Sequence, residues 1–231
     1  SQTSNNIFLN EKLLARVKSI YDKKEQLNLS TEDAKLLEDL YESFKANGAT
    51  LNKDDKEKYR KLSMDLSMLT LQFDQNALKD KNRFELLITD ENELSGLPES
   101  ARDAAAMLAK SKDKNGWLFN LSAPSYIPFM RYSDKRDLRE KMYREYMSVG
   151  NKGDEFDNKD IIKKIVNIRL EIAQLMGFKN YAEYALEHTM AKNSANVYKL
   201  LNQLLEAYKP IAINEYNAVE GFALGLSLIH I

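Results

Sequence analysis

The chain has 231 residues, which is long enough for one or two domains with a sizeable core. Its 34 Lys and Arg residues nearly balance 35 Asp and Glu residues, and a net charge of −1 argues against nucleic acid or an anionic membrane as the main partner, because both attract a basic excess. The absence of cysteine excludes disulfides, thiol catalysis and cysteine-ligated metals. No apolar run approaches the ~20 residues of a membrane-spanning helix.

Three helices are predicted in the first third of the chain. Apolar residues recur at helical spacing from Glu11 to Lys24. Ser30 begins a capping-box-like start for a second helix, and Gly48 follows its end. Asn52 is expected to cap a longer third helix that runs towards Lys79.

The middle of the chain predicts a small two-stranded β element near residues 84–121. The run 84–88 is too short for a helix, and Trp117, Phe119 and Leu121 recur with a period of two. A helix opening at Leu97-Pro98 should bridge the two strands. The stretch from Pro124 to Pro128 is expected to be extended before each proline, and to mark a junction.

Helices are predicted again after this junction, so the fold class is mainly α. Ser133 should cap a helix that ends at Gly150, and Asp157 should cap a run of apolar residues that Gly177 closes. A short helix is expected over 181–188. Ser194 should cap the last helix, in which Pro210 is expected to cause a kink or an interruption.

A self-contained active site is not visible in the sequence. The two histidines, His188 and His230, form no His-x-x-x-His pair, and His188 is interpreted as a helix-end residue, with metal ligation as the alternative. No Gly-x-Ser-x-Gly elbow and no phosphate-binding glycine loop occur. No catalytic, cofactor-binding or metal-binding residue is therefore assigned.

Three clusters of charged or aromatic residues are candidate functional sites, but a structural interpretation is preferred for each. The acids near residue 157 should cap a helix rather than bind calcium. A mixed-sign helix face should be solvated rather than bind nucleic acid. An aromatic cluster at the junction should be core rather than a substrate groove. The acidic cluster consists of Asp154, Glu155, Asp157 and Asp160. The mixed-sign face consists of Arg131, Asp134, Lys135, Arg136, Asp137, Arg139 and Glu140. The aromatic cluster consists of Tyr126, Phe129, Met130 and Tyr132.

A family resemblance adds to this reading. The stretch 125–192, with PSYIPFMRYSDKRDLREKMYREYMSVG and DNKDIIKKIVNIRLEIAQLMGFKNYAEYALEHTMAKN, resembles the peptidyl-dipeptidase branch of the thimet oligopeptidase and oligopeptidase A family of zinc metallopeptidases. Residues 62–78 resemble a long helix in the N-terminal region of that family. Together the similar segments cover most of residues 10–224, in the same order.

The resemblance implies two helical lobes beside a deep channel, and a zinc-dependent enzyme that hydrolyses short peptides. The family's His-Glu-x-x-His motif does not occur here, so the resemblance assigns no site residue, and the chain alone is expected to bind no zinc and to be inactive. Residues 1–132 would form an N-terminal helical lobe, and 133–225 would begin a catalytic region whose remainder is the expected partner. The alternative is a free-standing helical binding module without catalysis.

Two expectations concern the ends of the chain. Residues 226–231, Leu-Ser-Leu-Ile-His-Ile, depart abruptly from the resemblance and could be encoded by a sequencing-adapter string, so we expect a non-native tail; a natural apolar terminus is the alternative. The first residue is not Met, so the true start is expected upstream. The expected location is cytoplasmic, with the periplasm as an alternative.

Overall fold

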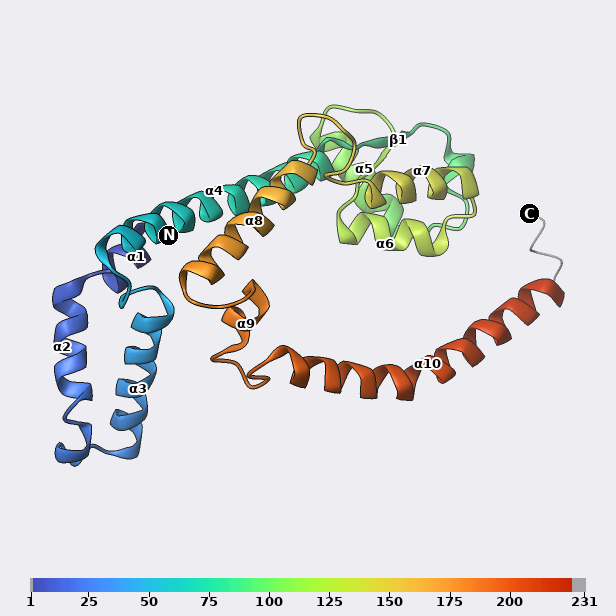
Figure 1. Ribbon diagram of the computed structural model, residues 1–231. Helices are drawn as coiled ribbons and strands as arrows, with labels where there is room; N and C mark the ends of the chain where they lie inside the picture. Colours follow the sequence, from blue (N-terminus) through green and yellow to red (C-terminus); the bar gives the residue numbers. More distant parts are fainter. Residues whose placement is uncertain (1, 226–231) are drawn as a thin grey trace. The chain divides into compact units, whose positions relative to one another are not determined.

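The computed structural model describes residues 2–225, which form two compact units. One unit contains Arg60–Ile168 and the first residues of the chain, and the other contains Asn5–Tyr59 and the residues from Arg169 onward. The helices α4 (Lys53–Arg83) and α8 (Lys159–Leu175) each pass from one unit into the other (Figure 1). The predicted boundary between residues 132 and 133 falls inside one unit, and stays a prediction about the parent protein.

The unit that contains Asn5–Tyr59 is built on a helical hairpin. Its helices are α2 (Glu11–Tyr21) and α3 (Thr31–Ala46), with a 3-10 turn at Lys24–Gln26, and the unit also contains α1 (Gln2–Phe8) from Asn5 onward. The predicted cap of α3 is confirmed, because the Ser30 hydroxyl accepts a hydrogen bond from the Asp33 amide at 3.1 Å. A small core of Val17, Phe44 and Ala49 holds the hairpin together.

The same unit contains the last two helices, α9 (Tyr181–Leu186) and α10 (Ser194–Gly225). The Tyr184 hydroxyl donates to the Ala46 carbonyl at 2.7 Å, which ties α9 to the end of α3. The cap of α10 is Asn193, whose side chain accepts from the Asn196 amide at 2.9 Å, so the prediction of Ser194 was one residue late. Of the kink or interruption expected at Pro210, the interruption does not occur, because α10 continues as one helix on both sides of this residue.

The other unit surrounds a two-stranded sheet. Strands β1 (Leu86–Ile88) and β2 (Trp117–Phe119) pair antiparallel, with Leu87 opposite Leu118. Helix α5 (Glu99–Ser111) bridges the strands, preceded by a 3-10 turn at Glu91–Leu94. Helices α6 (Ala123–Tyr132) and α7 (Arg136–Met147) complete the unit (Figure 1). Its core is formed by ten buried residues: Phe84, Leu86, Ile88, Leu94, Leu97, Ala105, Phe119, Leu121, Phe129 and Met142.

The prediction of extended backbone from Pro124 to Pro128 is wrong, because α6 is helical. Pro124 lies in the first turn, where a helix needs no amide donor. Pro128 removes one hydrogen bond inside α6, and the packing of Phe129, which is fully buried, holds the helix in spite of that loss.

The predicted helix start after Ser133 is also wrong, since α7 begins at Arg136. The intervening Asp134 amide donates to the Ser95 carbonyl at 2.9 Å, which keeps this residue out of the helix. The Ser133 hydroxyl does accept from the Lys135 amide, at 3.2 Å.

The mainly α fold with one small sheet is confirmed. Several predicted ends shift by a few residues: α2 ends at Tyr21, α4 extends to Arg83 and α9 ends at Leu186. Within residues 2–225, no helix combines the length and the apolar character that crossing a membrane requires. The expected tail at residues 226–231, with His230, lies outside the described residues.

Candidate functional site

His188 lies in a pocket of about 160 Å³ formed by the end of α3 and the segment around α9. Its Nε2 atom is 3.3 Å from a carboxylate oxygen of Glu187, and its side chain is 44% exposed. Another pair in the pocket, Lys45 with Glu42, is 3.0 Å apart. In the described part of the chain, no group of three or more His, Asp or Glu side chains is placed to hold a metal ion.

The acidic cluster near residue 157 does not form one site. Asp157 accepts hydrogen bonds from the amides of Gly153 and Lys159, at 2.7 and 2.9 Å. Its carboxylate thus binds the first amide of α8, close to the predicted capping role, although Asn158 is the residue that precedes the helix. Asp160 pairs with Lys163 at 3.2 Å, and Asp154 points to a different helix.

The predicted aromatic cluster separates into core and surface. Phe129 is buried and packs edge-to-face on Phe119, with 4.8 Å between ring centroids. Tyr126 is half-buried and stacks on Tyr146 at 4.3 Å. Tyr132 is 45% exposed and lies under the guanidinium of Arg131. The expectation of a core role is therefore confirmed for Phe129 and wrong for Tyr132, which lies at the exposed end of α6.

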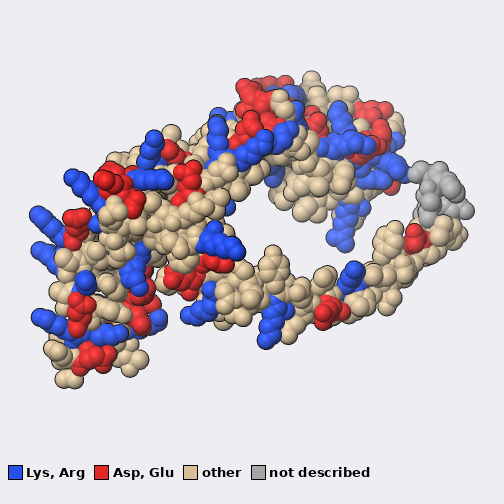
Figure 2. Space-filling view, viewed as in Figure 1, with Lys and Arg blue, Asp and Glu red and all other residues tan. Residues whose placement is uncertain are grey.

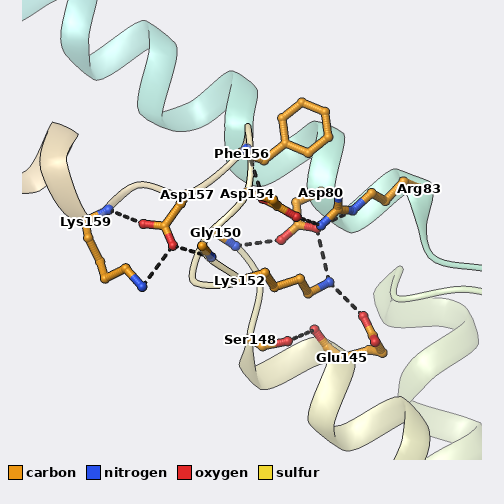
Figure 3. A network of polar contacts seen from close by, with 11 residues as sticks. Asp80, Arg83, Glu145, Ser148, Gly150, Lys152, Asp154, Phe156, Asp157 and Lys159 are labelled. Carbon is orange, nitrogen blue, oxygen red and sulfur yellow. Dashed lines mark hydrogen bonds and ion pairs between the residues drawn. The ribbon is translucent and has the colours of Figure 1, made fainter.

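A buried polar network centres on Asp80, a fully buried residue in the last turn of α4. One carboxylate oxygen accepts from the Gly150 amide at 2.7 Å, and the other lies 2.7 Å from Arg83 Nε and 3.1 Å from Lys152 Nζ. Lys152 also pairs with Glu145 at 2.7 Å. Figure 3 shows these side chains converging between α4, the end of α7 and the following loop. Three donors compensate the cost of burying this carboxylate.

Electrostatics in the network favour the charged forms. Burial works to lower the pKa of Lys152, but hydrogen bonds to Glu145 and Asp80 outweigh it and raise that pKa above its ordinary value. The hydrogen bond from Arg83 lowers the pKa of Asp154. Arg83 also lies over the ring of Phe156, 5.1 Å from its centroid.

A second buried contact fixes the other end of the same loop to α4. The Asn76 side-chain nitrogen Nδ2 donates to Asn158 Oδ1 at 3.1 Å, and Asn158 Nδ2 donates to the Phe73 backbone carbonyl at 3.0 Å. Both asparagines are buried. The loop between α7 and α8 is therefore attached to α4 at both ends, which positions the start of α8.

Sequence reasoning missed this network, although a signal was present. The apolar stripe of α4 is spaced three and four residues apart, and the same spacing continues through Asn76 to Asp80. Polar residues in the register of a buried stripe indicate buried partners. The network contains no nucleophile paired with a base. Its role is therefore structural: it fixes the backbone of the loop and the charged side chains around Asp80.

Comparison with known proteins identifies the relatives of this chain. The profile of peptidase family M3 matches residues 129–229. Oligopeptidase A of Haemophilus influenzae is 36% identical over 197 residues, which are 84% of this chain and 29% of the relative. Oligopeptidase A of Escherichia coli is 34% identical over 92% of this chain and 32% of the relative. The resemblance to the M3 peptidases is confirmed.

Two branches of M3 peptidases are represented among the relatives. The dipeptidyl carboxypeptidase of Escherichia coli is 30% identical over 221 residues, 95% of this chain and 32% of the relative. The chain thus spans about 29–32% of the length of these three relatives. Their similarity includes the loop that Asp80 holds, together with the helices on either side of it.

Proposed function

We propose that this chain is the N-terminal part of an M3 metallopeptidase that hydrolyses short peptides. The observation that carries the proposal is the sequence identity of 30–36% over 84–95% of the chain to oligopeptidase A and dipeptidyl carboxypeptidase. Release of dipeptides from the C-terminal end is the specific action we propose, by analogy with the second of these relatives.

Zinc is proposed as the cofactor of the parent enzyme, held outside residues 2–225. The residues described here do not fit the ion, because a catalytic zinc needs three protein ligands and His188 contacts a single neighbouring carboxylate. No catalytic step is therefore assigned to side chains of this chain. We propose that its part is to shape access to the site.

The dimensions of α4 support a role in shaping a channel. The helix has 31 residues and is therefore about 46 Å long at 1.5 Å per residue. The Asp80 network and the Asn76–Asn158 contact hold the loop between α7 and α8 against the C-terminal half of this helix. A channel with rigid helical walls admits flexible peptides and excludes folded proteins, because unfolding them costs several kcal/mol.

The rest of the catalytic region is the proposed partner of α10. Most large apolar side chains of this helix are exposed, among them Leu201, Leu205 and Phe222. Its surface is mostly uncharged, whereas acidic and basic side chains are interspersed over the other helices (Figure 2). We further propose a cytoplasmic location for the parent enzyme, with the periplasm as the alternative.

The test uses the full-length parent protein with a short peptide and a folded protein as substrates. We expect cleavage of the peptide alone, loss of activity with a chelator and recovery with zinc. Equal cleavage of both substrates, or activity that resists the chelator, would contradict the proposal. A parent protein that binds peptides without cleaving them would favour the binding module instead.

A further inference from the structure

A cationic groove lies on the unit that contains the sheet, between α6 and α7. It has a volume of about 380 Å³ and is lined by Met130, Arg136, Arg139, Glu140, Tyr143 and Arg144. All lining residues except Met130 belong to α7, where their spacing of three and four places them on one helix face. With three arginines and one glutamate, the groove carries a net charge of +2.

Two of the guanidinium groups are already held in position. Arg139 donates to the Ser133 carbonyl, at the end of α6. Arg144 binds Glu140 through two nitrogens, each 2.7 Å from the same carboxylate oxygen. Fixing these side chains before a ligand arrives reduces the entropy that binding would otherwise cost.

The composition of the groove is that of a recognition surface. Arginine, tyrosine and methionine are the residues enriched at protein interfaces, and Tyr143 is 50% exposed here. Arginine also matches a carboxylate with two parallel hydrogen bonds. From Arg136 to Arg144 the helix rises about 12 Å, which is the length of about four residues of extended peptide.

We propose that this groove binds a short extended peptide through its carboxylates, either acidic side chains or the C-terminal carboxyl group. A peptide fits better than a nucleic acid, because its few carboxylates can lie against separate arginines and away from Glu140 and the neighbouring Asp137, whereas a continuous phosphate backbone would also place charges next to these acids. The choice of a peptide rests on the proposed function, whereas the preference for carboxylates rests on the groove itself. The groove would thus favour acidic peptides.

The experiment measures binding to the 231-residue chain by fluorescence anisotropy, with a pentapeptide that carries a neutral dye. Four versions combine glutamate or glutamine side chains with a free or amidated C-terminus. We expect the glutamate peptides to bind at least tenfold more tightly than their glutamine counterparts, and this difference to shrink at high salt. The two termini show whether the end carboxyl contributes as well.

The decisive variant is Arg136→Gln with Arg144→Gln, both exposed positions whose change should leave the fold intact. The control, Lys141→Gln with Lys163→Gln, removes the same charge from exposed positions outside the groove. We expect at least tenfold weaker binding in the first variant and less than a twofold change in the control. Circular dichroism of both verifies folding, and Tyr143→Ala provides a second variant that keeps every charge.

Three results would overturn the proposal. These are equal loss of affinity in both double variants, equal binding of glutamate and glutamine peptides, and tighter binding of an oligothymidine than of any peptide. A parent enzyme that fails to hydrolyse peptides would refute the proposed function, but the carboxylate preference of this chain would stand.

Discussion

The sheet unit and helix α10 contrast in how they use apolar side chains. The unit built from β1, β2 and α5–α7 encloses ten buried core residues, among them Phe129 and Met142, which have no exposed surface. Helix α10 has 32 residues and none is buried; Phe222, for instance, is 69% exposed. Apolar periodicity is present in both segments, so the pattern indicates that a helix needs a partner, and only the structure shows whether the partner is supplied by this chain.

The largest expected effect is on the stability of the sheet unit. Phe129→Ala should destabilise it by about 3–5 kcal/mol, because a fully buried ring is replaced by a cavity. The matched change in α10, Phe222→Ala, should cost less than about 0.5 kcal/mol, since that ring is largely exposed. Urea unfolding followed by circular dichroism measures both. Equal costs would contradict the contrast between the two regions.

The buried network around Asp80 should show the next largest effect. Asp80→Asn removes the charge that binds Arg83 and Lys152, and breaking such a buried pair costs about 3 kcal/mol. Asp74→Asn, an exposed position on the same helix, should change the stability by less than about 0.5 kcal/mol. Chemical unfolding of the two variants makes the comparison, and hydrogen exchange at Gly150 should rise in the first alone. Unchanged protection there would show that Asp80 does not hold the loop.

Exposure of α10 should appear as dye binding and self-association of the chain. Replacing Leu201, Leu204 and Tyr208 by glutamine should lower the fluorescence of a hydrophobic dye by half or more, because contiguous apolar surface binds such dyes and promotes association. Replacing the polar Asn202 and Gln203 by alanine is the control. Sedimentation gives the oligomeric state. If the unsubstituted chain is monomeric and does not increase the fluorescence of the dye, the apolar surface of α10 is covered.

Local signals predicted most of the secondary structure because their physical causes are local. Ser30 caps α3 and Gly48 adopts a φ of +81° after it, a conformation that glycine adopts without strain. The strand pair was predicted from one short apolar run and one segment with a period of two, and the structure supplied its register. Errors occurred where distant contacts decided the outcome: Asp134 binds Ser95, which delays the start of α7.

The candidate sites were less predictable, because they depend on residues far apart in sequence. Asp80 meets the Gly150 amide across 70 positions, and no local pattern specifies that meeting. The arginines of α7 were recognised as a mixed-sign face, but the pattern could not show that Met130 and Tyr143 would border a groove with them. The sequence does show that Asp80 continues the spacing of the buried apolar residues of α4. This spacing indicates that Asp80 is buried, but it does not identify the partners of Asp80.

The smallest predicted effect on stability concerns the ion pairs of Glu85, the residue before β1 in the sheet unit. Hydrogen bonds from Lys112, which has the larger effect, and from Lys114 lower the pKa of this carboxyl below its ordinary value of 4.5. A depressed folded-state pKa means that the stabilisation is present above pH 4.5 and is lost as pH falls through the folded-state value. Because the side chain is 24% exposed and both pairs are near the surface, Glu85→Gln should cost less than about 1 kcal/mol at neutral pH.

The same pH series provides the control for Glu85. The difference in unfolding free energy between the original chain and Glu85→Gln should fall towards zero below the folded-state pKa, because the protonated carboxyl and the amide are both neutral. With Lys112→Gln and Lys114→Gln also present, the Glu85→Gln change should lose this dependence on pH, since the partners that depress the pKa are gone. A pH dependence that persists without the two lysines would assign the effect to another carboxyl group. Loss of the pH dependence without the two lysines would show that surface ion pairs stabilise the sheet unit. The largely uncharged surface of α10 has few such pairs to contribute.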